Sequence, residues 1–590
     1  METLTNQTSI NRFLSFIKPE RLYFYLLACC SLVSNGLITA MPFVMGIAID
    51  KLLSAIKSSE GPLSVELIAE VIGTPVLIIL FLATVSAAIS YVQEQMMASL
   101  SEKITLRLRK EITKKFKVLP MSFFDTHQVG DILSRTTNDI NRIAEVLLTG
   151  INQLFSSIVT IILGIAMLLY IDSQLTGIIL ILIIGSSAVT TWVAIKNKKL
   201  ADKNQGELGV LNNQTEEFFS GNLEIKTFNK QKDTANTIEI TNLRHAKAFQ
   251  DSQFFDYAIY PAIRFLNQLA FIVSAIVGAG MVLQGSMTIG IIQAYLQYVN
   301  QISEPITNFS YVINAIQGAM ASLDRVLVIL DQQEEMAENN NLLSINNSEG
   351  EIVFDQVKFG YTPDKILMKE VSFIARPRKM IAIVGPTGAG KTTLVNLLMR
   401  FYEINDGKIT FDGKDITSLS RKELRSMFGM VLQNTWLFEG SVADNIAYGK
   451  KDATRQEVVE ASKVAQCDHF IRTLPDGYDT IISSEGGALS QGQQQLLTIA
   501  RVILANPPVV ILDEATSSVD TRTEAEIQQA MSVVTQGRTS FVIAHRLSTI
   551  EKADLILVME AGTIVEQGNH NELLAEDGLY AKLHQSQFKE

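Results

Sequence analysis

The stretch MIAIVGPTGAGKTTL, residues 380–394, decides the class of the second half of the chain. Its first five residues are apolar and predict a buried strand, and the residues from Lys391 onward predict a helix. The glycine-rich turn between them, with Gly385, Gly388 and Gly390, lets the backbone approach a ligand closely. Backbone N–H groups of such a turn, together with the N-terminus of the helix, bind phosphate oxygens. The stretch therefore predicts a phosphate-binding loop between a strand and a helix.

The side chains of this loop indicate that its ligand is a nucleoside triphosphate with Mg²⁺. Lys391 is placed to reach the β- and γ-phosphates, and the Thr392 hydroxyl is placed to bind the metal ion. We expect the ligand to be ATP, with contacts from Gly385, Thr387, Gly388, Gly390, Lys391, Thr392 and Thr393.

Two acidic residues end a second apolar strand, VVILDE at 509–514. We expect Asp513 to act on Mg²⁺, usually through water, and Glu514 to orient or deprotonate the attacking water. Such general-base assistance is worth about 10²–10⁴-fold in rate. His545 ends the following strand, FVIAH, and is expected to contact the γ-phosphate. The predicted catalytic set is Lys391, Glu514 and His545.

Two further sequences extend the expected nucleotide site. Tyr361, in KFGYTP, offers a ring that can stack on adenine. Ser490 and Gly492, in LSQGQ (489–493), begin an apolar helix whose N-terminus is a second anion-binding end. Because Lys391 already serves the nucleotide of its own chain, this second end indicates the nucleotide of another subunit.

The two halves of the chain differ in composition. Apolar strands that alternate with helices predict an α/β domain with a parallel sheet over 351–590: EIVFDQVKF, MIAIVG, VVILD, FVIAH and LILVME. Residues 331–350 are polar and rich in Asn, and predict a linker. Before the linker, five runs contain no Asp, Glu, Lys or Arg: 22–49, 71–93, 146–171, 173–195 and 265–303.

These uncharged runs predict a membrane domain. The first four are each long enough for one transmembrane helix, and the fifth has room for two that meet at GSMTIG (285–290). We therefore predict an α-helical membrane domain with six transmembrane helices over 1–330, followed by the P-loop ATPase domain. Buried helices of a soluble protein are the alternative, and this alternative would have to hold for every run.

The charged segments predict the orientation in the membrane. Lys and Arg concentrate in 94–145 and 196–264, which places both segments, both termini and the ATPase domain in the cytoplasm of a multi-pass cell-membrane protein. Residues 11–21 predict an amphipathic elbow helix on the inner face, among the membrane lipids. The turns in 121–140 and 218–229 are expected to dock on ATPase domains.

Charge and cysteine content exclude other functions. A net charge of −11 argues against nucleic acid as a partner. Cys29 and Cys30 lie together in the first apolar run and Cys467 stands alone, so the three cysteines suggest neither a disulfide nor a metal site.

Together these motifs resemble the ABC transporter superfamily, specifically bacterial exporter half-transporters of the multidrug or lipid type. By this resemblance Tyr361 is the A-loop, 385–392 the Walker A motif, 489–493 the signature and 509–514 the Walker B strand. Gln433 is the Q-loop residue near Mg²⁺, Asp520 closes the D-loop at 517–520, and His545 is the switch histidine. The resemblance implies a head-to-tail dimer in which each ATP lies between one chain's Walker A and the other's signature. It also implies coupling helices at 121–131 and 218–228, the second docking on the partner's ATPase domain.

Gln491 departs from the family pattern, which reads LSGGQ at the signature. Glycine allows close backbone approach and positive φ, whereas glutamine adds a side chain next to the γ-phosphate. In bacterial heterodimeric exporters, one subunit carries an altered signature beside an intact Glu and His, and this chain resembles that kind. The resemblance therefore implies a heterodimer in which Lys391, Glu514 and His545 build the hydrolytic site. An ordinary homodimer that tolerates Gln491 is the alternative.

The expected function is ATP-driven export of amphipathic or hydrophobic compounds, such as drugs or lipids. A homodimeric lipid A-type flippase and an ATP-gated regulatory ABC protein remain alternatives; a soluble DNA-repair ATPase would lack the apolar runs. Arg264 and Glu304 bracket the last uncharged run near the inner leaflet. Glu304 is expected to attract cationic substrates, to pair with Arg264, or to lie with it in the interfacial region.

Overall fold

The computed structural model describes residues 12, 16, 18–58, 65–336, 338, 343, 345, 348–362, 364–433, 435–482, 489–513, 520–544 and 547–587. The chain divides into two compact units. The first comprises Met1–Lys117 and Gln128–Gln332, and the second comprises Val118–His127 and Gln333–Glu590. The short segment Val118–His127 thus belongs to the second unit, although the chain on both sides of it belongs to the first.

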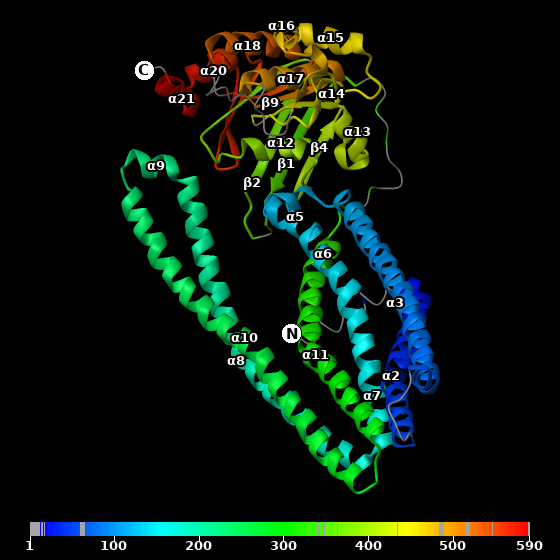
Figure 1. Cartoon of the computed structure of the whole chain (residues 1–590). Coiled ribbons are helices and arrows are strands. Elements are labelled where there is room, and N and C mark those ends of the chain that lie inside the picture. The colour runs from blue at the N-terminus through cyan, green and yellow to red at the C-terminus, as the bar shows by residue number, and fades with distance from the viewer. Residues whose placement is uncertain are drawn as a thin grey trace. The chain divides into compact units, whose positions relative to one another are not determined.

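Long helices build the first unit (Figure 1). These are α2 (Arg21–Ser58), α3 (Val65–Phe116), α7 (Asn152–Ile171), α8 (Ser173–Ser220), α10 (Gln231–Leu283) and α11 (Ile289–Leu330). Shorter elements connect them: η1 (Lys18–Glu20), α5 (Val129–Thr136), α6 (Asn138–Glu145), the π-helical turn η2 (Val146–Ile151) and α9 (Asn222–Thr227). The chain turns between α10 and α11 at Gly285, whose φ is 72°, within the predicted turn GSMTIG.

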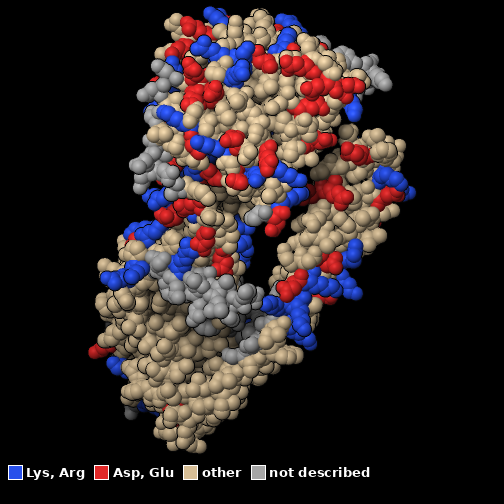
Figure 2. Space-filling model, turned by 180° about the vertical axis from the view of Figure 1, so that it is seen from behind, with Lys and Arg blue, Asp and Glu red and all other residues tan. Residues whose placement is uncertain are grey.

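Four helical segments are long and apolar enough to cross a membrane: Lys18–Ser58, Ile68–Phe116, Val129–Ile171 and Arg264–Leu283. A shorter apolar segment begins α8, at Ser173–Gly185. Within the described residues α11 is not among them, because its first half carries the amides Gln293, Gln297, Asn300 and Gln301. The lower part of the surface in Figure 2 is correspondingly almost free of charged side chains. The helical membrane domain is confirmed, and the number of six transmembrane helices stays a prediction.

Side-chain hydrogen bonds join the apolar helices. Asn35 of α2 accepts hydrogen bonds of 3.0 Å each from Ser156 and Thr160 of α7. On the neighbouring residue of α2, the Ser34 hydroxyl oxygen lies 2.7 Å from that of Ser90 in α3. Without a hydrophobic driving force between helices in lipid, such bonds contribute about 0.6–2 kcal/mol each. They join α2 to both α3 and α7.

The C-terminal part of α2 and the start of α11 meet backbone to backbone. A Cβ atom on Gly290 would lie 2.0 Å from the carbonyl oxygen of Gly46, so only glycine fits there. The Asp50 carboxylate accepts from the Gly290 N–H at 2.8 Å and from the Thr288 hydroxyl at 2.6 Å. A carboxylate at this place stabilises the start of α11, because it satisfies an N–H group that lacks a helical partner.

The core of the second unit is a six-stranded sheet in the order β12-β11-β3-β10-β9-β6. Its strands are β12 (Thr563–Gly568), β11 (Leu555–Glu560), β3 (Met380–Val384), β10 (Thr539–Ile543), β9 (Val509–Asp513) and β6 (Phe428–Val431). All neighbours are parallel except the hairpin of β11 and β12. The accompanying helices are α12 (Lys391–Leu398), α13 (Arg421–Ser426), α14 (Val442–Ala447), α15 (Arg455–Val464), α16 (Asp468–Thr473), α17 (Gln491–Ala505), α18 (Thr521–Thr535), α19 (Leu547–Ile550), α20 (His570–Ala575) and α21 (Leu579–Gln587). The predicted α/β ATPase domain is confirmed.

One strand prediction is wrong. The sequence EIVFDQVKF predicts a strand of the parallel sheet, but β1 (Ile352–Phe359) belongs to a separate antiparallel sheet of order β2-β1-β4-β5. Its other strands are β2 (Met368–Ala375), β4 (Asp406–Phe411) and β5 (Lys414–Asp415), and a further pair joins β7 (Gly440–Ser441) to β8 (Ile481–Ile482). The short connection from β1 to β2 accounts for their antiparallel pairing, because parallel neighbours require a crossover of a dozen or more residues.

The two predicted docking turns also have defined structures. Residues 121–131 form α4 (Met121–Thr126), which lies in the second unit, and the start of α5. Residues 218–228 comprise the end of α8, which carries Phe219, then α9, which carries Leu223, and then Phe228; these three side chains are each more than 70% exposed. In the single chain, this turn therefore exposes three large apolar side chains. The predicted elbow helix at 11–21 falls largely outside the described residues.

Candidate nucleotide site

The loop between β3 and α12 has the backbone geometry of a phosphate cradle. Gly385, Gly388 and Gly390 have φ angles of 151°, 82° and 102°, in the region that favours glycine. A Cβ atom on Gly385 would lie 2.2 Å from the carbonyl oxygen of Met559 in β11, so the neighbouring strand leaves no room for a side chain. Gly390 precedes α12 and provides no side-chain cap. The first N–H groups of α12 are therefore not taken by a capping side chain and can bind phosphate oxygens.

Lys391 lies over this loop. Its Nζ donates to the carbonyl oxygens of Gly385 at 2.8 Å and Pro386 at 3.0 Å. Burial lowers the pKa of the Lys391 ammonium group, and the charge of Asp513 partly opposes this shift. The structure thus brings the end of β9 and the start of α12 into electrostatic contact. A triphosphate can replace the two carbonyl oxygens as the acceptor of the ammonium hydrogens, so this site fits ATP.

Tyr361 lies beside the same helix. Its hydroxyl oxygen is 2.9 Å from that of Thr393, and its ring meets Phe359 and Tyr402 edge to face, with centroids 5.0 Å away in both cases. The residue is nevertheless 50% exposed. These contacts hold an accessible ring next to α12, which is compatible with the predicted stacking on adenine.

The signature sequence begins α17, and two of its own residues cap the N-terminus of this helix. The Ser490 side chain accepts from the Gln493 N–H at 3.3 Å, and the Gln493 side chain accepts from the Ser490 N–H at 2.9 Å. Gln491 is exposed and has helical backbone angles, while Gly492 is buried. Position 491 therefore needs no positive φ, and what glutamine changes there is the exposed side chain.

The other predicted site residues lie as follows. Asp520 caps α18 by accepting from the N–H groups of Thr523 at 3.0 Å and Arg522 at 3.1 Å, and the bond from Thr523 is the first cause of its lowered pKa. Gln433 is exposed just after β6. Glu514, His545 and residues 517–519 lie outside the described residues, so their roles remain predictions.

A contact that the sequence did not indicate connects α4 to the nucleotide site. The Tyr402 hydroxyl donates to the carboxylate of Asp125 in α4. Burial, and then this bond, raise the pKa of Tyr402. The N–H of Glu335 donates to the carbonyl of Val118 at 2.8 Å, which holds the same segment. Asp125, Tyr402 and Tyr361 therefore form a continuous line of contacts, and no residue pattern had singled out Tyr402.

Arg264 and Glu304, the two membrane-domain candidates, are both exposed. Within the described residues no ion pair joins them. The roles of Arg264 and Glu304 both stay predictions.

Comparison with known proteins agrees with both halves of this description. The family described as ABC transporter transmembrane region matches residues 24–306, and the family described as ABC transporter matches residues 368–517. The chain is 44% identical over 498 residues to a fatty acid ABC transporter ATP-binding/permease protein of Mycobacterium bovis, covering 84% of this chain and 79% of that protein. It is 32% identical over 579 residues to an ATP-dependent lipid A-core flippase of Syntrophus aciditrophicus, covering 98% and 94%.

A solved structure is similar over nearly the whole chain. The structure of a bacterial Atm1-family ABC exporter with ATP bound has a TM-score of 0.75 and 26% sequence identity, covering 97% of this chain and 99% of that one. Fold, phosphate loop and relatives agree: this chain is an ATP-hydrolysing, membrane-embedded member of the ABC transporter family, of the exporter type, with its membrane region and its ATPase domain on one polypeptide.

Proposed function

We propose that this chain is one subunit of a heterodimeric exporter that moves amphipathic or hydrophobic compounds, of the lipid or drug kind, out of the cytoplasm or the inner leaflet. The observation that carries the heterodimer is the exposed Gln491 side chain in the first turn of α17. In a head-to-tail dimer this turn faces the nucleotide held by the partner chain, so a side chain absent from the family pattern stands next to the γ-phosphate.

This arrangement makes the two ATP sites unequal. The site at Lys391 of this chain is completed by the partner's signature and hydrolyses ATP. The site closed by LSQGQ of this chain binds ATP and hydrolyses it poorly, because an amide side chain displaces the backbone from the phosphate. The capping box of Ser490 and Gln493 keeps the helix end intact in spite of the substitution, so the weaker site can still bind nucleotide.

In the hydrolytic site, residues of this chain bind the phosphates of ATP and activate the attacking water. The loop N–H groups and Lys391 bind the phosphates, and Glu514 takes the proton of the attacking water. His545 contacts the γ-phosphate. Mg²⁺ neutralises charge on the β- and γ-phosphates when bound, and the residues that would hold it are Thr392, Asp513 and Gln433. The position of Asp513 within electrostatic reach of Lys391 supports this assignment.

Two turns would couple the ATPase cycle to the membrane domain. The first is α4, whose Asp125 bonds to Tyr402 beside the expected adenine position. The second is the turn at 218–228 around α9, where the exposed Phe219, Leu223 and Phe228 would dock on the partner's ATPase domain. Burial of such apolar side chains stabilises a contact by about 1.5–3 kcal/mol each. We also propose that the ATPase domain and both termini are cytoplasmic.

The substrate class rests on the relatives and on the membrane domain. The names of two relatives specify a fatty acid and lipid A-core. Glu304 is exposed on α11 and would contact a cationic group of an amphipathic substrate. Replacing Glu304 with Gln should then weaken the transport of cationic compounds and leave that of neutral ones unchanged; equal transport of both at normal expression would remove this contact.

The test of the proposed function is ATP hydrolysis by Glu514→Gln, measured with this chain alone and co-expressed with the half-transporter encoded beside it. We expect near-complete loss in the pair and little activity of either form alone. The matched control replaces the residue at the corresponding position of the partner, which should leave activity nearly unchanged. High activity of the unmodified chain alone, abolished by Glu514→Gln, would instead establish a homodimer such as a lipid A-type flippase.

A further inference from the structure

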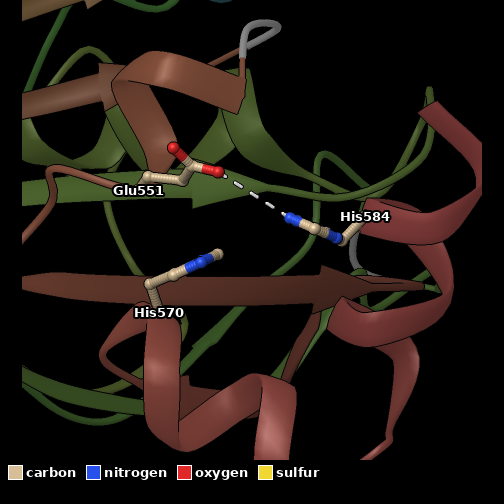
Figure 3. Close-up of side chains that lie close together, drawn as sticks. All are labelled: Glu551, His570 and His584. Atoms are coloured by element: carbon tan, nitrogen blue, oxygen red, sulfur yellow. Dashed lines mark ion pairs between the residues drawn. The ribbon is translucent and has the colours of Figure 1, made fainter. Parts of the chain in front are cut away.

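Two of the six histidines of the chain converge on one glutamate near the C-terminus, outside the nucleotide site. One ligand atom each of Glu551, His570 and His584 lie within 4.8 Å of one another. Figure 3 shows the His570 ring and the His584 ring directed toward the carboxylate of Glu551. His584 Nε2 lies 3.8 Å from Glu551 Oε1. The three residues come from three separate elements: the turn after α19, the start of α20, and α21.

From this cluster we propose a binding site for a divalent transition metal of the Zn²⁺ class, with two imidazole ligands and one carboxylate ligand. Two histidines and a glutamate form a known three-ligand set for zinc, with the fourth position left to water. Bonds of about 2.0–2.2 Å to a shared ion separate tetrahedral ligands by about 3.3 Å. The three atoms therefore need to close by about 1 Å or somewhat more, which side-chain rotation can supply.

The surroundings of His570 favour a ligand role. Its Nδ1 lies 2.6 Å from the hydroxyl oxygen of Tyr580. When Nδ1–H donates to Tyr580, Nε2 carries the free lone pair that a metal requires, and such an outer hydrogen bond orients the ring. Tyr580 is 2% exposed, so the hydrogen-bonding partner is held firmly in the core.

The backbone on both sides of the cluster is also fixed before any ion binds. Asn569 and Glu572 form a capping box that orders the first turn of α20 around His570. The carboxylate of Glu566 in β12 accepts from the N–H groups of Leu579 and Tyr580 and so anchors the start of α21. Ligands on such ordered elements lose little conformational freedom when a metal binds. A bound ion would clamp α21 to the turn after α19, and its binding would stabilise the fold of the ATPase domain.

The test is Zn²⁺ and Co²⁺ titration of the full-length protein in detergent, with the bound metal counted by competition with a chromophoric chelator. We expect one equivalent of Zn²⁺ that is lost in His584→Ala and in His570→Ala, and a tetrahedral Co²⁺ absorption band that disappears with it. Tyr580→Phe keeps the packing but removes the hydrogen bond, and should weaken Zn²⁺ affinity by about 10–100-fold. His469→Ala, at an exposed histidine in α16, is the matched control and should change nothing.

One variant separates loss of a metal ligand from disruption of the fold. Glu551→Gln removes a charged ligand without touching the bond between His570 and Tyr580, so its loss of affinity cannot come from a disrupted α20. Equal Zn²⁺ binding by the unmodified protein and by His584→Ala would overturn the proposal, as would the absence of any bound equivalent. ATP hydrolysis is not the readout, so these outcomes are independent of the proposed export function.

Discussion

Two helices of the ATPase domain begin at predicted phosphate-binding ends, and they begin in different ways. α12 follows Gly390, which has φ 102° and offers no side-chain cap, so an incoming phosphate can serve as the cap. α17 follows Ser490, which caps the helix reciprocally with Gln493 and leaves the Gln491 side chain exposed. The first end depends on an external anion to satisfy its N–H groups, whereas the second is partly satisfied by its own residues. The N-terminus of α12 therefore needs a bound anion to satisfy its N–H groups more than the N-terminus of α17 does.

The largest effect on ATP hydrolysis should come from removing the charged group at the start of α12. Lys391→Ala removes the ammonium group that bonds to Gly385 and Pro386 and that we expect to bind the phosphates. Loss of one such preorganised donor reduces turnover by about 10²–10³-fold. Steady-state ATP hydrolysis by the assembled transporter measures this, and Lys463→Ala on the exposed side of α15 serves as the control. Retained hydrolysis in Lys391→Ala would mean that the loop does not hold the phosphates.

The second effect concerns the backbone of the first end. Gly385→Ala places a Cβ atom 2.2 Å from the Met559 carbonyl oxygen at φ 151°. We expect a destabilisation of about 2 kcal/mol, which lowers the Tm of the ATPase domain by about 4–8 °C. Gly413→Ala also has positive φ but meets no atom within 4 Å, so it separates the strain of φ from the clash. Differential scanning fluorimetry gives both values; equal shifts would show that Met559 yields easily.

A smaller effect on ATP hydrolysis should follow from substitution at the start of α17. Gln491→Gly removes the exposed side chain from the signature and should raise ATP hydrolysis toward the rate of two equal sites, because the other site already hydrolyses ATP. Gln491→Ala is the matched intermediate, because it removes the bulk but keeps a Cβ atom. If neither substitution changes the rate at saturating ATP, the two ends differ in structure but not in activity.

The smallest effect is the loss of the cap itself. Ser490→Ala removes the hydroxyl that accepts from Gln493, at a cost of about 1 kcal/mol and thus about 2–4 °C in Tm. The same substitution at Ser441, which caps α14 through a capping box with Asp444, provides the comparison. A shift at Ser490 that grows when ATP is present would indicate that the hydroxyl also binds nucleotide.

The sequence predicted the motifs of the site better than their contacts. Spacing alone placed the phosphate loop between β3 and α12, and Asp513 at the end of β9, because apolar runs and glycine turns are local signals. The bond between Tyr361 and Thr393 and the bond between Tyr402 and Asp125 join residues distant in the chain, so no local pattern could indicate them. Glu514 and His545 stay predictions from motif and resemblance.

By itself, the sequence determined that the chain has an apolar helical half and an α/β half that binds a triphosphate, because burial in lipid and phosphate binding both require particular residue types at fixed local spacing. Tertiary structure alone decided that β1 leaves the parallel sheet, that Asp125 of α4 contacts Tyr402, and that Glu551, His570 and His584 meet. Each of these depends on which distant segments pack together, and that choice is made by the free energy of the whole fold.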